Sequence, residues 1–201
     1  MTQAVPTQSE TPLSQLVFQY RRFISTGSMI LGIMFMEIFG DRTGWLSWSI
    51  GLGLVMLGLT YRVRAAAYLL GRHVVTRIEA ESLCVAGPFA RVRNPLYIGN
   101  FIIGLGVALA LNQWYCYLIF AFEFSLMYAF IIPYEEKFLK AKFGLAYEKY
   151  RAAVKRFLPR LKPYRKSCDV RPDFRAAMRG ERIHFFILLI SFSIFYLLFI
   201  A

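Results

Sequence analysis

The sequence predicts an all-α fold: a polytopic integral membrane bundle of about five transmembrane helices, with amphipathic helices near the C-terminus on the cytoplasmic side. Composition is the first observation behind this prediction, because 57% of the 201 residues are hydrophobic and only 18% are charged. That balance is too apolar for a typical soluble domain. Long apolar stretches that alternate with basic segments are the second observation, and the one-sided distribution of these basic segments is the third.

Apolar stretches at five places are the expected membrane spans. Several approach the roughly 20 residues that a spanning helix needs. The third stretch is short, but it can form a hairpin with the fourth across Asn112 and Gln113. The expected spans are residues 23–39, 45–61, 96–111, 114–134 and 183–201.

Basic residues decide the expected orientation. Every lysine and arginine except Arg42 either precedes the first span or lies in segments 62–95 and 135–182. The positive-inside rule therefore puts the N-terminus and both segments in the cytoplasm, and we expect a bacterial inner membrane. The net charge of +12 fits an inner leaflet better than nucleic acid, because the basic residues alternate with apolar stretches.

The segment 135–157 carries apolar and aromatic residues at near-helical spacing, with lysines and arginines between them. Such a segment is expected to lie along the membrane surface. Gly144 is expected to break it into two helices, and Pro159 and Pro163 end the regular pattern.

Cysteine and histidine give no sign of a metal site or of a disulfide framework. Cys84, Cys116 and Cys168 lie far apart without CxxC spacing. His73 and His184 have no clustered cysteine or carboxylate partners at metal-ligand spacing. No metal is therefore expected.

Two polar clusters stand where cytoplasmic segments meet helices, at residues 87–99 and 133–137. They become neighbours if the third and fourth spans form a hairpin. Pro95 suits a helix start, and the backbone donors just beyond it can hold an anion beside Arg91 and Arg93.

Glu135 and Glu136 would then receive an ammonium group or ribose hydroxyls, because ionised carboxylates are strong acceptors. Together the two clusters suit a zwitterionic ligand. An alternative is purely structural: the arginines set the topology, and the glutamates form a solvated helix start. On spacing alone this second interpretation stands slightly ahead.

Three ordered motifs carry a family resemblance. The first reads Arg-Asn-Pro-Leu-Tyr-Ile-Gly at 93–99, after Gly-Pro-Phe at 87–89. The second is the glutamate pair followed by Leu139, and the third reads Phe-Gly-Leu-Ala-Tyr-Glu-Lys-Tyr at 143–150. In this order they resemble the isoprenylcysteine carboxyl methyltransferase and phospholipid methyltransferase superfamily of membrane enzymes. The resemblance covers about residues 83 to 159.

The resemblance implies S-adenosylmethionine bound in a cytoplasm-facing pocket, with a lipophilic methyl acceptor entering from the bilayer for O- or N-methylation. The chain is expected to divide into a polar leader at 1–22, a methyltransferase-like domain at 23–164, and a basic linker with an extra transmembrane helix at 165–201. The cofactor region at 83–159 is the part that the resemblance covers, and the extra helix lies beyond it. By this resemblance, Glu135 and Glu136 would hold the polar end of the cofactor, and Leu139 would face the adenosine. One wall of the cofactor site would be formed by Arg93, Asn94, Pro95, Tyr97 and Gly99.

Asn94 departs from the pattern, because the superfamily usually has histidine there. An amide can form hydrogen bonds but cannot titrate near neutral pH, so a role as base is excluded at this position. Asn94 and Glu136 are nevertheless the candidate catalytic residues. The departure and the extra C-terminal helix leave open a non-catalytic relative that serves as a binding or assembly protein. A transporter is disfavoured by the absence of a sequence repeat.

Overall fold

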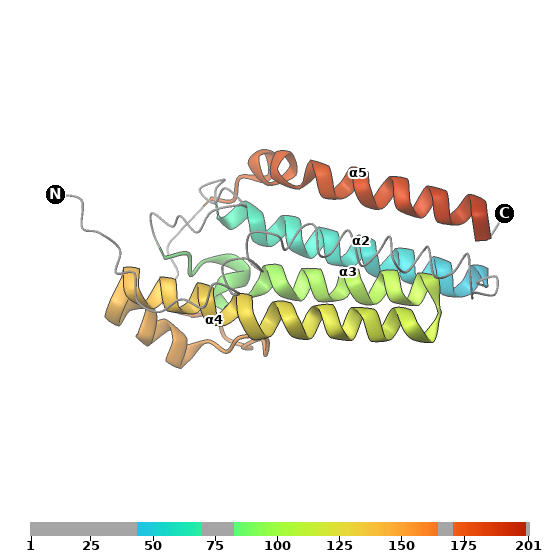
Figure 1. Cartoon of the computed structure of the whole chain (residues 1–201). Helices are drawn as coiled ribbons and strands as arrows, with labels where there is room; N and C mark the ends of the chain where they lie inside the picture. The colour runs from blue at the N-terminus through green and yellow to red at the C-terminus, as the bar shows by residue number, and fades with distance from the viewer. Residues whose placement is uncertain (1–43, 70–82, 165–170, 200–201) are drawn as a thin grey trace.

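The computed structural model describes residues 44–69, 83–164 and 171–199, and within these ranges all regular structure is helical. The all-α prediction is therefore confirmed for the described part of the chain (Figure 1). The leader at 1–22 and the expected span at 23–39 lie outside the described residues. The helices are α2 (Trp45–Tyr68), the 3₁₀ helix η1 (Gly87–Ala90), α3 (Pro95–Leu111), α4 (Trp114–Ala153) and α5 (Phe174–Phe199).

Helices α2 and α4 are each long and apolar enough to cross a membrane. Helix α5 is bent by 47° between Ile183 and Phe185, and it adds a third candidate if its two parts form one span. Helix α3 has 17 residues and is a shorter apolar helix. The structure thus supports a membrane protein of two or three candidate spans over the described ranges, and the count of about five stays a prediction.

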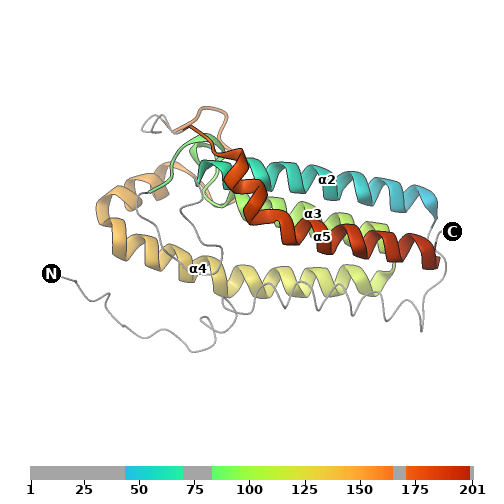
Figure 2. The same ribbon diagram turned by 90° about the horizontal axis from the view of Figure 1, so that it is seen from above.

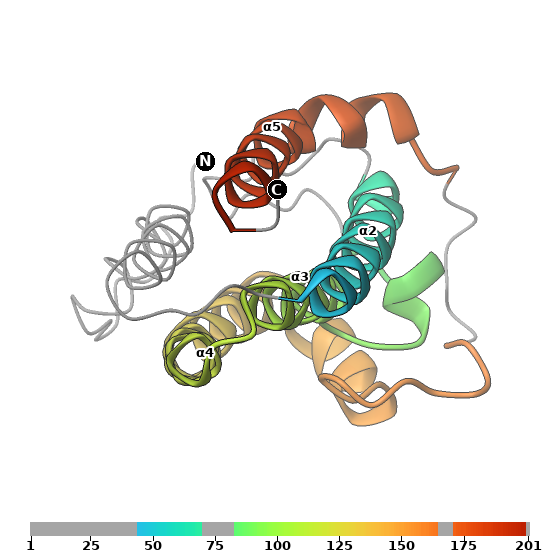
Figure 3. The same cartoon turned by 90° about the vertical axis from the view of Figure 1, so that its right-hand side faces the viewer.

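The expected hairpin of α3 and α4 is present. It turns at Asn112, which takes the left-handed conformation with φ 50°, and Gln113 then precedes α4. Helices α2, α3 and α4 lie in a row, and α5 lies against α2 (Figure 3). Glycines allow α2 and α3 to approach closely: a Cβ at Gly51 would come within 2.5 Å of the Gly106 carbonyl oxygen.

The part of α4 before Gly144, residues 114–143, corresponds to roughly 45 Å of helix, about one and a half times the hydrocarbon thickness of a bilayer. The expected fourth span and the amphipathic segment are therefore one continuous helix up to Gly144, with Pro133 inside it. Prolines are tolerated within membrane helices where neighbouring groups satisfy the freed carbonyls. At Gly144 (φ 49°, ψ −125°) the helix breaks as predicted, and its last part turns back toward the bundle (Figure 2).

Helix α5 begins at Phe174, nine residues before the start expected from hydrophobicity at 183. The reason is local. The Asp173 carboxylate accepts a hydrogen bond from the Ala176 backbone N–H at 2.9 Å, which caps the helix start. The Asp173 N–H also donates to the Ala67 carbonyl oxygen at 2.9 Å, so this helix start is fastened to the end of α2.

Candidate functional site

The segment that precedes α3 is shaped by its glycine and proline. Gly87 has φ 55°, and a Cβ there would lie 2.5 Å from the Tyr68 ring, so only glycine fits. Pro88 then starts η1. The Tyr150 hydroxyl donates to the Phe89 carbonyl oxygen at 2.7 Å, which ties the third motif to the residues before the first.

Residues 155–164, here called the return loop, lie along residues 90–94. Arg93 and Asn94 donate backbone hydrogen bonds to the carbonyl oxygens of Lys155 and Arg156, at 2.9 and 3.2 Å. Two further bonds run the other way, from Arg160 N–H to the Arg91 carbonyl and from Tyr164 N–H to the Ala90 carbonyl, both at 2.9 Å. The Arg91 guanidinium also donates to the Leu161 carbonyl at 2.7 Å, so Arg91 fastens the loop.

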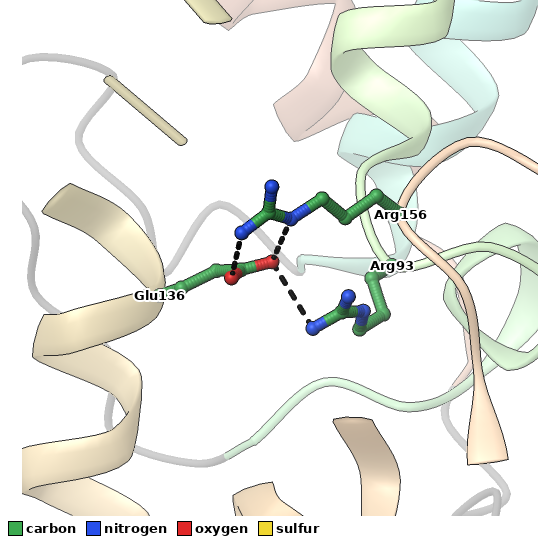
Figure 4. A network of polar contacts seen from close by, with 3 residues as sticks. All are labelled: Arg93, Glu136 and Arg156. Atoms are coloured by element: carbon green, nitrogen blue, oxygen red, sulfur yellow. Dashed lines mark hydrogen bonds and ion pairs between the residues drawn. The ribbon is translucent and has the colours of Figure 1, made fainter. Parts of the chain in front are cut away.

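Glu136 on α4 is the centre of a charged network with two arginines (Figure 4). Arg156 of the return loop donates to both carboxylate oxygens, from Nε at 2.9 Å and from Nη2 at 2.7 Å. Arg93 places Nη1 3.0 Å from Oε1. The side chains of Glu136 and Arg93 are 9% and 10% exposed, whereas that of Arg156 is 42% exposed. One carboxylate thus faces two guanidinium groups, and the cluster keeps a net positive charge.

Several donors in this cluster lack an acceptor. Arg93 Nε, Arg93 Nη1 and Asn94 Nδ2 are buried without a well-aligned hydrogen-bond partner among the described residues, although the Arg93 guanidinium also lies against the Tyr147 side chain. Arg93 Nη1 lies 3.0 Å from Glu136 Oε1, so the two form an ion pair, but the N–H does not point at this oxygen and no hydrogen bond forms. Buried donors nearly always have a partner, so this surplus suits a ligand or water that brings acceptor oxygens.

Glu135 lies beside this network and contacts the first motif. The Tyr97 hydroxyl donates to Glu135 Oε1 at 2.7 Å, and the Tyr128 hydroxyl donates to the Tyr97 carbonyl oxygen at 2.5 Å. The structure therefore brings the glutamate pair of α4 and the start of α3 together, as expected from the hairpin.

Three other predicted site residues have clear packing roles. Pro95 is fully buried at the first turn of α3. Gly99 faces α2, where a Cβ would lie 2.9 Å from the Arg62 Cβ, so its small size serves helix packing. Leu139 packs against a cluster of Val85, Tyr147, Tyr150 and Val154. Direct cofactor contacts of these residues stay predictions.

Arg156 is the site residue that the sequence analysis missed. It was one of many basic residues in the C-terminal segment, and only the fold of the return loop selects it. Its hydrogen bonds to Glu136 raise the pKa of the guanidinium above its ordinary value, so it stays charged at any working pH. The only sequence signal was its place just after the third motif, where the regular helix ends.

A second buried ion pair connects helices α2 and α5. Arg62 Nε donates to Glu181 Oε2 at 2.8 Å, and the two side chains are 10% and 3% exposed. Arg62 also donates to the side-chain oxygen of Asn100 on α3. This cluster holds α5 against the end of the bundle where the site lies, and it was not predicted from the sequence.

No group of three or more histidine, cysteine, aspartate or glutamate residues suited to a metal ion occurs among the described residues. The candidate site within the described residues is the charged network around Glu136.

The chain is similar to several known proteins. It is 26% identical over 162 residues to the nickel-cobalt-cadmium resistance protein NccN of Alcaligenes xylosoxydans xylosoxydans, covering 77% of this chain and 72% of that protein. It is 32% identical over 112 residues to protein-S-isoprenylcysteine O-methyltransferase of Schizosaccharomyces pombe, covering 54% of this chain and 48% of that enzyme.

Protein-S-isoprenylcysteine O-methyltransferase B of Arabidopsis thaliana is 29% identical over 165 residues, covering 78% of this chain and 82% of that enzyme. No solved structure matches the chain significantly. The family model described as phospholipid methyltransferase matches residues 46–146, which include α2 from its second residue, α3, the first two motifs and the start of the third. The chain therefore belongs to the phospholipid methyltransferase family, within the superfamily that also contains the isoprenylcysteine methyltransferases.

Proposed function

We propose that this protein is an S-adenosylmethionine-dependent methyltransferase of the membrane that methylates a lipid or lipid-like acceptor. The observation that carries this proposal is the network of Arg93, Glu136 and Arg156, because it joins the first two family motifs and lies beside donors without acceptors. Membership of the family supports the reaction class.

The charges of the network fit the amino-acid end of the cofactor. An ammonium group would bind Glu136, and a carboxylate would bind one of the two arginines, so a zwitterion would replace one internal ion pair with two new ones. The buried donors Arg93 Nε and Asn94 Nδ2 would gain acceptors. Glu135 would accept from the ribose hydroxyls while it keeps its bond from Tyr97.

When bound, the cofactor supplies an electrophilic methyl group on a sulfonium. The protein's part is to hold the acceptor in line and to exclude water. Burial of Glu136 and Arg93 makes their charges more effective than they would be in water. A carboxylate acceptor is already ionised and needs no base. An amine acceptor must lose a proton first, and because Asn94 cannot remove it, a glutamate or the solvent would take that proton.

A non-catalytic role in binding or assembly is the second candidate. Two observations favour it: Asn94 replaces the histidine of the superfamily pattern, and both oxygens of Glu136 already have arginine partners. A partner protein captured by crosslinking, together with cofactor binding but no turnover on any lipid extract, would favour this second role.

Cofactor binding to the detergent-purified protein is the first test. Isothermal titration with S-adenosylmethionine is expected to give saturable binding in the wild type, weaker binding in Glu136→Gln and a smaller loss in Asn94→Ala. Glu148→Gln is the matched control, because Glu148 forms an exposed ion pair with Lys140 on the same helix. A folded wild-type protein that does not bind the cofactor would refute the proposal.

The acceptor is then sought with the cofactor carrying a labelled methyl group and with membrane lipid extracts. Label in the organic phase identifies a lipophilic acceptor. Release of the label by mild base indicates a methyl ester, whereas resistant label indicates an N-methyl product. Label that stays in the water phase would contradict the lipid part of the proposal.

A further inference from the structure

The tip of the return loop, residues 155–162, exposes two leucines although backbone hydrogen bonds fix the loop to residues 90–94. Leu158 is 65% exposed and Leu161 is 94% exposed, and Lys155 and Lys162 are exposed beside them. Exposed leucines among basic side chains in a fixed loop suit a partner that is apolar on one side and anionic on the other. We propose that this tip is a docking surface for anionic lipid headgroups, and that its leucines enter the leaflet at this end of the bundle.

Charge selects the kind of lipid. Lys155, Arg160 and Lys162 lie within eight residues, and no aspartate or glutamate occurs between residues 149 and 168. Arg156 is excluded from this count because Glu136 holds it. A cluster of basic side chains around apolar ones is the pattern that binds a negatively charged membrane surface.

Position supports the same partner. The Phe157 ring packs on the Tyr128 ring with centroids 5.1 Å apart, and Tyr128 lies in the apolar part of α4. The loop therefore lies beside the apolar part of α4, six residues before the end of the span expected at 114–134, and the chain returns toward the bundle after Gly144 (Figure 2). The backbone bonds to residues 90–94 fix it there.

The consequence concerns the candidate site. Arg156 belongs to the same short loop, so lipid contact at Leu158 and Leu161 would steady the residue that holds Glu136. The lipid docking itself does not depend on methyl transfer, and its test uses no activity.

A tryptophan at position 161 is a direct probe. The native Trp45, Trp48 and Trp114 all lie at the other end of α2 and α4. Trp45→Phe and Trp114→Phe remove the two exposed ones, and Trp48, which packs on Phe192, stays as a constant signal. Leu161→Trp in this background is reconstituted into vesicles of phosphatidylcholine, alone or mixed with phosphatidylglycerol. Each vesicle carries bromine either near the headgroups or near the bilayer centre.

We expect the added emission to be blue-shifted in the mixed vesicles and to be quenched more by bromine near the headgroups than by bromine near the centre. Lys155→Gln with Lys162→Gln should abolish most of this quenching in mixed vesicles. In phosphatidylcholine alone, the same double substitution should change little. Circular dichroism and gel filtration check that each variant is folded.

Two results would overturn the proposal. Emission at the wavelength of tryptophan in water, with no quenching by either bromolipid, would show that the tip does not contact the bilayer. Equal quenching with and without phosphatidylglycerol, unchanged by the lysine substitutions, would refute the preference for anionic lipid.

Discussion

Replacing Glu136 by glutamine tests the charged network most directly. The substitution keeps the size of the side chain and removes the charge that Arg93 and Arg156 share. Breaking a buried ion pair by removing one partner costs about 3 to 5 kcal/mol. The lower end applies here, because the Arg156 side chain is 42% exposed and can turn toward water, whereas Arg93, 10% exposed, cannot.

The loss should appear locally, because Arg156 ties the return loop to α4. About 3 kcal/mol corresponds to roughly a hundredfold increase in local opening. Amide hydrogen exchange is the assay. It is read at the four backbone N–H groups that pair the return loop with residues 90–94, those of Arg93, Asn94, Arg160 and Tyr164. The matched variant Glu148→Gln removes an exposed ion pair and should leave these amides unchanged.

The reasoning would be refuted if Glu136→Gln left exchange at these four amides as slow as in the wild type while the protein stayed folded. That result would mean that the backbone bonds alone hold the loop. Faster exchange across the whole bundle would refute it as well, because the network would then stabilise the entire fold and not this loop.

Three further predictions concern other positions. Gly99→Ala should lower the free energy of unfolding, measured by melting in detergent, by about 1 to 3 kcal/mol, because its Cβ would meet the Arg62 Cβ at 2.9 Å. The control Gly53→Ala should leave this free energy unchanged, because a Cβ there meets no described atom within 4 Å. Glu181→Gln should cost about 3 kcal/mol in the same melting assay, because it breaks the buried pair with Arg62, and an unchanged melting temperature would contradict this. Asn94→His should make the rate of methyl transfer depend on pH near neutrality, with the rate rising as the imidazole loses its proton. A rate that does not change with pH in this range would count against a position of residue 94 beside the cofactor.

Much of the architecture could be read from local sequence. Apolar stretches located α2, α3, the first half of α4 and the later part of α5, because a membrane helix needs a long run of apolar residues. Gly144 located the break in α4. The start of α5 was missed because hydrophobicity ignores polar turns, although Asp173 carries a cap signal that could have located it.

The motifs likewise predicted that the start of α3 would meet Glu135 and Glu136, because a hairpin makes its two open ends neighbours. The sequence could not tell which of the many basic residues would reach Glu136. That choice depends on the bend at Gly144 and on four backbone hydrogen bonds between distant segments.

The sequence by itself therefore determined the fold class, the family and the two motif segments that form the candidate site, since each rests on local pattern. Only the tertiary structure selected Arg156 as the partner of Glu136, Arg62 as the partner of Glu181, and Gly99 as a packing residue. The physical reason is that a charged side chain can pair with any opposite charge within its reach. Which one it meets is decided by how the helices and the return loop pack, and no local pattern encodes that geometry.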